Sequence, residues 1–198
     1  MPEWIQGIDD HVLRWFLDHH TKFLDQNLLN VTALGSTTVL AMVAVFAVGV
    51  LLFGGQCRHA VLVGLVVVGV FFATDAIKDQ VARRRPEIGK GVIPTPHSPS
   101  FPSGHASLTM TVLLVVAMCV QVRPRKAEMQ WASGYLVVWA VVVILLVGIS
   151  RLYLGVHFLS DVVGGWLLGV AFVGVFWGLE RLTGGRTAPD AGSVSRAG

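Results

Sequence analysis

Three short polar stretches of the chain hold residue types that could do chemistry on an anionic group. They contain Lys78 and Arg85, then Ser103, Gly104 and His105, and finally Arg151, His157 and Asp161. Cationic side chains neutralise phosphate oxygens, and the fork of an arginine matches two such oxygens at once. A phosphoryl group in transfer spreads charge over its oxygens, so catalysis on it is mostly positioning and electrostatic stabilisation. The residue types therefore favour a site that handles phosphate.

The spacing of the first pair predicts local structure. Lys78 and Arg85 are seven residues apart, close to two helical turns, so on one helix they would share a face. They would lie ~10 Å apart along the axis, and their long side chains would have to converge on the phosphate. Pro86 is expected to end that helix.

The second stretch reads as the beginning of a helix. Ser103 is a candidate N-cap, and the backbone N–H groups of Gly104 and His105 would form an anion site. Gly104 would let a phosphate approach the backbone closely.

The third stretch pairs an imidazole with a carboxylate. His157 and Asp161 are spaced i, i+4, which on a helix places them on one face. A carboxylate that accepts from one imidazole nitrogen fixes the tautomer and leaves the other nitrogen free to attack phosphorus.

The composition indicates how these residues are positioned. Of the 198 residues, 54% are hydrophobic and 14% charged, whereas soluble domains carry about 25% charged residues. The apolar residues form five blocks near the ~20 residues that a membrane-crossing helix needs. The blocks cover residues 31–53, 60–77, 106–122, 132–149 and 162–179. The backbone has no polar partner in hydrocarbon, so each block should be helical. The predicted fold class is all-α, a polytopic membrane helical bundle with five transmembrane helices.

The order of the blocks predicts where the polar stretches meet. Between Lys78 and Ser150 the chain crosses the membrane twice, through the third and fourth blocks. Residues 78–104 and 150–161 must then lie on the same side of the membrane.

The two ends of the chain differ from the blocks. Residues 4–29 alternate apolar and charged positions at helical spacing, which predicts an amphipathic helix lying in the interface. A helix packed on the end of the bundle would show the same pattern, and the two interpretations are compatible. If the segment also crossed the membrane, the spans would number six. The predicted organisation is an interfacial segment at 1–30, a membrane-embedded catalytic domain at 31–182, and a disordered tail at 183–198 rich in small and polar residues.

Three motifs run through the polar stretches in a fixed order. Lys78 to Pro86 reads KDQVARRRP, Pro102 to His105 reads PSGH, and Ser150 to Asp161 reads SRLYLGVHFLSD. They match the patterns KxxxxxxRP, PSGH and SRxxxxxHxxxD. Over residues 31–180 the chain therefore resembles the type 2 phosphatidic acid phosphatase family, which also includes the vanadium haloperoxidases.

The resemblance implies a membrane-bound lipid-phosphate phosphohydrolase with a phosphohistidine intermediate. His157 would be the nucleophile, Asp161 would orient it, and His105 would protonate the leaving alcohol and then activate water. The other motif residues would bind the substrate phosphate: Lys78, Arg85, Ser103, Gly104 and Arg151. We expect neither a metal ion nor another cofactor, because the sequence shows no metal-ligand cluster.

The motifs recognise only a terminal phosphate, so they do not identify the lipid. Phosphatidate, phosphatidylglycerophosphate and undecaprenyl pyrophosphate all fit. We expect a multi-pass protein of the cell (plasma) membrane with its site on the extracytoplasmic side.

Two other functions have to be weighed. A vanadate-dependent haloperoxidase-like enzyme would share the pocket, but those family members are soluble. A non-catalytic membrane scaffold or transporter would also be helical and basic, but it would be expected to lack one of the motif residues. Nucleic acid is excluded as a partner despite the net charge of +3, because no soluble basic face remains outside the apolar blocks.

Several residues near the motifs receive structural interpretations. Arg83 and Arg84 are expected to contact lipid headgroups. Asp75, three residues before Lys78, could tune the position of that lysine, but we expect it to form an interfacial salt bridge. The glycines of the last block recur at small-xxx-small spacing, which predicts tight helix packing within the bundle. They are Gly165, Gly169, Gly174 and Gly178.

Overall fold

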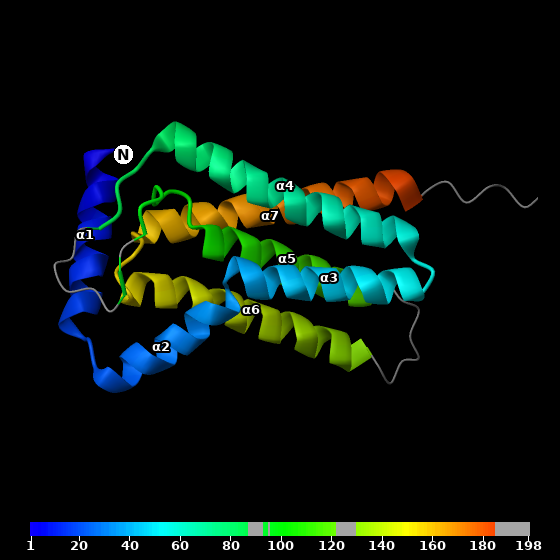
Figure 1. Ribbon diagram of the computed structural model, residues 1–198, viewed down its shortest axis with the longest axis horizontal. Coiled ribbons are helices and arrows are strands. Elements are labelled where there is room, and N and C mark those ends of the chain that lie inside the picture. Colours follow the sequence, from blue (N-terminus) through cyan, green and yellow to red (C-terminus); the bar gives the residue numbers. More distant parts are fainter. Residues whose placement is uncertain (87–92, 95, 122–129, 185–198) are drawn as a thin grey trace, which may run out of the picture.

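The described part of the chain is built from α-helices alone (Figure 1). A computed structural model describes residues 1–86, 93–94, 96–121 and 130–184. The helices are α1 (Glu3–Asp18), α2 (Lys22–Leu34), α3 (Thr37–Phe53), α4 (Cys57–Val81), α5 (Gly104–Gln121), α6 (Gln130–Tyr153) and α7 (Leu159–Gly184). The all-α prediction is therefore confirmed over these residues.

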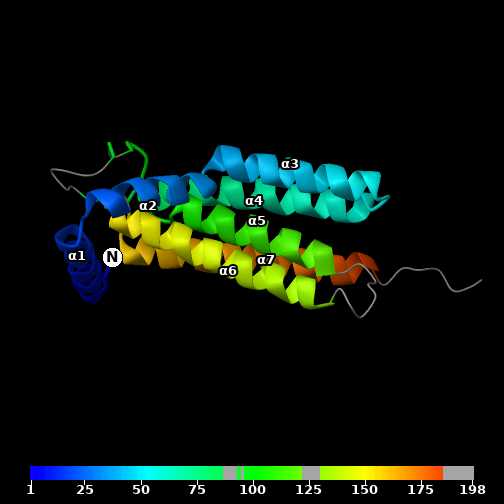
Figure 2. The same ribbon diagram turned by 90° about the horizontal axis from the view of Figure 1, so that it is seen from below.

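Helices α3 to α7 run along a common direction, and α1 lies across one end of them (Figures 1 and 2). The central helix is α5, which contacts α3, α4, α6 and α7. Helix α1 contacts α6 and α7, so the predicted interfacial segment is docked on the bundle. The C-terminal end of α7 lies at the end of the bundle away from α1 (Figure 1).

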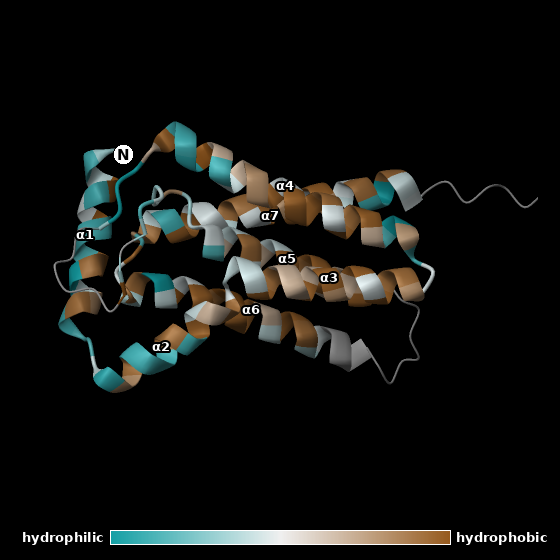
Figure 3. Ribbon diagram, in the orientation of Figure 1, coloured by the Kyte–Doolittle hydropathy of each residue, from teal (hydrophilic) through white to brown (hydrophobic). Residues whose placement is uncertain are grey.

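The surface of the bundle is apolar, as expected of helices that face lipid. Large side chains such as Phe46, Phe72 and Leu167 are exposed on α3, α4 and α7. Hydrophobic residues dominate along the middle of the bundle, whereas α1 mixes hydrophilic and hydrophobic residues (Figure 3). This division fits a membrane around the bundle and a polar environment at the end that carries α1.

The predicted spans correspond to α3 to α7, but they do not all reach full length. By length and composition, α4, residues 134–153 of α6, and α7 can each cross a membrane. Helices α2 and α3 add a fourth span if they are counted as one helix pair bent by 40°. Helix α5 is apolar but shorter over residues 104–120, which is consistent with its central, protein-covered position.

The N-terminal segment is two helices, not the single one predicted. Helix α1 ends at Asp18, and Thr21 caps α2 by accepting a hydrogen bond from the backbone N–H of Leu24. Helix α2 continues to Leu34, so residues 31–34 belong to it and not to the first predicted span. The break before α3 falls at Gly35, where a Cβ would clash with Val147 Cγ1.

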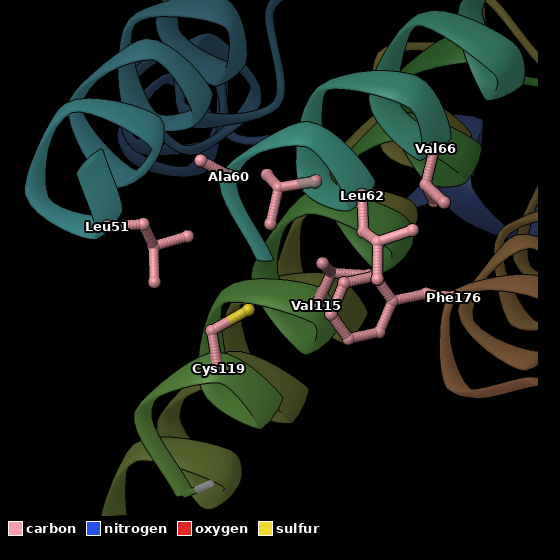
Figure 4. Packing of buried hydrophobic residues seen from close by; sticks show 8 residues of the cluster. Leu51, Ala60, Leu62, Val66, Val115, Cys119 and Phe176 are labelled. Atoms are coloured by element: carbon pink, nitrogen blue, oxygen red, sulfur yellow. The ribbon is translucent and has the colours of Figure 1, made fainter. Parts of the chain in front are cut away.

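The core of the bundle lies where α3, α4, α5 and α7 meet, and Figure 4 shows one of its clusters. Val63, Val115 and Phe176 are buried there. Gly165 and Gly169 allow close contact of α7 with α5, since a Cβ at either position would lie under 3.0 Å from α5 atoms. Nothing lies within 4 Å of a Cβ at Gly174 or Gly178. The packing prediction is thus confirmed for the first two glycines and wrong for the last two.

The predicted tail at 183–198 falls mostly outside the described residues. Helix α7 continues through Gly184, and residues 185–198 are not among those that the structure describes.

Candidate active site

The polar stretches meet at the end of the bundle where α1 lies. Arg85 Nη1 donates to His157 Nε2 over 3.0 Å and to the carbonyl of Val156 over 2.8 Å. Further along, Ser103 donates its backbone N–H to the carbonyl of Asp161 over 2.9 Å. These contacts confirm the prediction that residues 78–104 and 150–161 lie on the same side of the membrane.

Helix α4 ends earlier than the sequence predicted. Its last helical residue is Val81, and Ala82 adopts the left-handed conformation with φ 46° while donating its N–H to the carbonyl of Lys78. Arg85 therefore lies beyond the helix and does not share a face with Lys78. The prediction of one common helix face is wrong, because the left-handed residue ends the helix four positions before Pro86.

Arg85 is held in place by a loop. Its Nε donates to the carbonyl of Ser98 over 2.8 Å, and its Nη2 donates to Ser98 Oγ over 3.1 Å. A pocket of about 290 Å³ lies beside it, lined by residues 82–85 and 96–99. The guanidinium thus lies between this pocket and His157.

Lys78 reaches the site from the last turn of α4. A Cβ at Gly104 would lie 3.6 Å from Lys78 Nζ, so the ammonium is beside the first residue of α5. Asp75 Oδ1 lies 4.0 Å from the same nitrogen, which confirms the predicted salt bridge. Thr74 and Ser107 connect α4 to α5 through a 3.0 Å hydrogen bond between their buried hydroxyls.

The beginning of α5 is where the sequence placed it, but the expected cap is absent. Ser103 directly precedes the helix and is fully buried. Its Oγ makes no hydrogen bond among the described residues, so the predicted side-chain cap is not formed. The hydroxyl therefore remains available as a donor beside Gly104.

His105 and Arg151 complete the group of predicted residues. His105 lies within electrostatic range of Arg151, His157, Lys78 and Arg85. Arg151, at the end of α6, is 5% exposed and donates from Nη1 to Thr32 Oγ1 of α2 over 2.8 Å. Its Nε has no partner among the described residues. The structure thus brings all eight predicted site residues to one end of the bundle.

His157 lies in a turn and not on a helix. Gly155, with φ 65°, reverses the chain after α6, and α7 begins only at Leu159. Asp161 in the first turn of α7 accepts the backbone N–H of Phe158 at Oδ2 over 2.9 Å. This contact turns the segment so that His157 Nδ1 lies 3.5 Å from the same Oδ2.

That separation is longer than an ordinary hydrogen bond. The contact is therefore mainly electrostatic, which still favours a proton on Nδ1 and a lone pair on Nε2, where Arg85 donates. Catalytic hydrogen bonds often shorten only when substrate is bound.

The residues described contain no group of three or more His, Cys, Asp or Glu side chains arranged to hold a metal ion. The charged side chains that surround His157 are cations and the Asp161 carboxylate. These cations can bind an anion next to the imidazole of His157.

A family model described as the PAP2 superfamily matches residues 59–182, more than half of the chain. This chain belongs to the PAP2 superfamily. The family resemblance seen in the three motifs is thereby confirmed, and every residue of those motifs lies within the matched segment.

Two curated PAP2 relatives are similar in sequence. Phosphatidylglycerophosphatase B of Bacillus subtilis (strain 168) is 30% identical over 171 residues, which cover 84% of this chain and 80% of the relative. Undecaprenyl-diphosphatase of Sulfolobus acidocaldarius is 36% identical over 84 residues, which cover 41% of this chain and 35% of the relative.

Two crystal structures are similar in fold. A transmembrane PAP2 type phosphatidylglycerolphosphate phosphatase from Bacillus subtilis aligns with a TM-score of 0.83 and 26% identity, over 91% of this chain and 88% of that one. LpxE from Aquifex aeolicus aligns with a TM-score of 0.63 and 23% identity, over 86% and 94% of the two chains. The second likeness shows the fold alone.

Two residues of the site were not found from the PAP2 motifs. Arg83 was expected to contact headgroups, but its side chain is 9% exposed and forms ion pairs with Asp9 of α1 and Asp161 of α7. Headgroup contact is therefore the wrong interpretation for Arg83. One signal was present: Asp9 follows Ile5 by four residues and precedes Val12 by three, so it falls on the apolar face of α1.

Burial changes the titration of the nucleophile candidate. Loss of solvent lowers the pKa of His157 to about 4, although Asp161 opposes the shift. The unfolded chain, with an ordinary histidine pKa of about 6.5, binds more protons over this range. The stability linked to His157 is therefore present above about pH 6.5 and is lost as the pH falls toward 4.

We expect acid to destabilise the wild-type protein more than a variant without this imidazole. Between pH 7 and pH 5 the difference should be ~2 kcal/mol, because each pH unit inside the window contributes about 1.4 kcal/mol. Apparent melting temperatures of the wild type and His157→Asn in detergent, at both pH values, measure the effect. Equal losses in the two proteins would contradict a neutral, buried His157.

Proposed function

We propose that the protein is a membrane-bound phosphohydrolase that releases phosphate from a lipid phosphomonoester or isoprenoid pyrophosphate through a phosphohistidine intermediate. One observation carries the proposal: Arg85, from the first motif, donates a hydrogen bond to the nitrogen of His157 that would attack phosphorus. A cation that contacts the nucleophile in this way is placed to bring a phosphate oxygen beside it. The lipid phosphatase names among the PAP2 relatives support the same class.

The first chemical step is a transfer from the lipid to His157. The Nε2 lone pair bonds to phosphorus, the bond from phosphorus to the ester oxygen breaks, and His105 gives its proton to that departing oxygen. Arg85 would then donate to a phosphate oxygen in place of Nε2. Asp161 favours the proton on Nδ1, which keeps Nε2 nucleophilic.

The second step returns the enzyme to its starting state. His105 takes a proton from water, the water oxygen bonds to phosphorus, and the phosphorus–nitrogen bond to His157 breaks. Inorganic phosphate leaves. Lys78, Arg85 and Arg151 stabilise the charge on the oxygens in both steps, together with the backbone N–H groups at the beginning of α5.

The lipid part of the substrate needs an apolar surface next to the phosphate. A pocket of about 320 Å³ lies between α3 and α4, where Thr37, Leu40, Phe71 and Phe72 line it together with Leu108 of α5. Leu108 is three residues, about one turn, after His105. We propose that the first carbons of the lipid lie in this pocket, which suits phosphatidate, phosphatidylglycerophosphate and undecaprenyl pyrophosphate alike.

The charge distribution supports a site on the extracytoplasmic side of the plasma membrane. The other side carries seven Lys or Arg: Arg58, Arg123, Arg125, Lys126, Arg181, Arg186 and Arg196. The site side carries eight, but Lys78, Arg83, Arg85 and Arg151 have partners or roles in the site, which leaves four. Positive residues in short loops favour the cytoplasm, so we place Gly184 inside and α1 outside.

The first test of the function is phosphate release from a panel of the three lipids in detergent. We expect release from at least one lipid by the wild type, and release that persists in EDTA because cations of the protein neutralise the phosphate. His157→Ala should fold but retain less than about a hundredth of the turnover, since it lacks the nucleophile. Loss of activity in EDTA that magnesium restores, or a variant with more than about a tenth of normal turnover, would contradict the mechanism.

The role of His105 has a separate test. A leaving group that departs easily needs little protonation, so His105→Ala should form phosphoenzyme faster from an aryl phosphate than from an alkyl phosphate. Rapid-quench measurement of phosphoenzyme with both substrates decides this. An equal loss on the two substrates would rule out His105 as the acid.

The orientation is tested in intact cells with an impermeant thiol reagent. Single cysteines at Gln6 and at Ser195, in a background without Cys57 and Cys119, should differ: the first is labelled and the second is protected. The reverse pattern would place the site in the cytoplasm. Protection of both would contradict the placement of α1 outside.

A further inference from the structure

The N-terminal helix supplies a buried carboxylate to the active-site end of the bundle. Asp9 of α1 is 1% exposed. Its Oδ1 accepts the backbone N–H of Ser160 over 2.9 Å, and its Oδ2 accepts from Ser160 Oγ over 2.5 Å. Ser160 is the second residue of α7, so Asp9 caps that helix from a segment 151 residues away in the sequence. The first N–H groups of a helix lack partners within it, which explains the value of an acceptor there.

Arg83 connects this carboxylate to Asp161. Its Nη2 donates to Asp9 Oδ2 over 2.7 Å, and its Nη1 donates to Asp161 Oδ1 over 2.6 Å. The guanidinium also lies 4.2 Å above the ring of Phe158. One fork therefore binds two buried carboxylates from two helices, a geometry that the single ammonium of a lysine cannot reproduce.

The two oxygens of Asp161 have different partners. Arg83 occupies Oδ1, while Oδ2 accepts from Phe158 N–H and faces His157 Nδ1. With Oδ1 fixed, the carboxylate cannot rotate without losing a charge-assisted hydrogen bond. Arg83 thus sets the direction in which Oδ2 points at His157. Arg83 is itself held by the Asp9 carboxylate, and it also donates to Gln6 Oε1 and Ser160 Oγ.

We propose that Asp9 and Arg83 are positioning residues that hold Asp161, and through it His157, in the orientation for attack. The inference rests on the proposed phosphatase function and extends it to α1, which lies outside the segment matched by the family model. Both Nη atoms of Arg83 donate to carboxylates, so we assign neither Asp9 nor Arg83 a contact with the phosphate. A buried ion pair is weak support for stability, so the expected consequence is catalytic orientation.

The decisive measurement is a double-mutant cycle on turnover. Arg83→Lys should lower kcat by ~10- to 100-fold, the usual range for partners of a ligating histidine, while KM stays within about twofold because phosphate contacts are intact. Asp161→Asn should lower kcat by more, on the order of 10⁴-fold. Adding Arg83→Lys to Asp161→Asn should cost little further, because Arg83 acts through Asp161.

Two results would overturn the proposal. An increase in KM at constant kcat would mean that Arg83 binds phosphate or headgroups directly. A loss in the double variant equal to the product of the single losses would mean that Arg83 acts independently of Asp161. Arg14→Lys is the matched control, since Arg14 is exposed on α1 and should leave both constants unchanged.

A second variant tests α1 without altering Arg83. Asp9→Asn keeps an oxygen for Ser160 but loses the charge that holds Arg83, so kcat should fall and KM should not. Asp18→Asn, exposed on the same helix, is the control. Turnover is expressed per amount of folded protein, measured by gel filtration. If Arg83→Lys folds poorly, Asp9→Asn is the deciding variant. A normal kcat in Asp9→Asn would overturn the proposal. A wild type that releases no phosphate would instead refute the proposed function.

Discussion

Lys78, Arg85 and Arg151 bring three positive charges to one end of an apolar bundle, where they lie close enough to repel one another. Each of the three cations has a different partner. Lys78 has Asp75 nearby, Arg151 donates to Thr32, and Arg85 donates to backbone carbonyls. Carbonyls and a hydroxyl satisfy a guanidinium without cancelling its charge, so the site keeps a positive field that a phosphate can neutralise. The rest of the active-site end is arranged around this requirement.

Close packing of α5 against α7 brings the second and third motifs together. Gly165 permits the contact, because a Cβ there would lie 2.6 Å from the carbonyl oxygen of Ser103. The same contact allows Ser103 N–H to donate to the carbonyl of Asp161. The N-terminal turns of both helices are thereby fixed relative to each other before any substrate binds. Glycine in a spanning helix serves here to place two motif segments, beyond the general benefit of tight packing.

The sequence was sufficient for the features that depend on composition and spacing. Apolar blocks predicted the helices, their number predicted that the polar stretches meet, and the motifs predicted the family. It failed where a contact distant in sequence decides local structure. Nothing near Ala82 in the sequence marks the end of α4, since alanine favours helix. The chain after Ala82 is held by Arg83, which binds Asp161 of α7, and by Arg85, which binds His157 in the turn before α7. The sequence did not distinguish Asp9 from the other charged residues of an amphipathic helix, because its partners, Arg83 and Ser160, lie 74 and 151 residues away.

The early end of α4 is a geometric requirement of the site. On a continuing helix, Arg83 and Arg85 would point about 160° apart, and only one could face the bundle. Beyond Ala82 the chain is not helical, and burial alternates: Arg83 and Arg85 are partly buried, whereas Arg84 between them is exposed. Alternation of this kind is that of an extended chain, in which residues two apart share a side. Arg83 can then reach Asp161 while Arg85 reaches His157, so one turn of the backbone gives the two arginines access to both members of the pair.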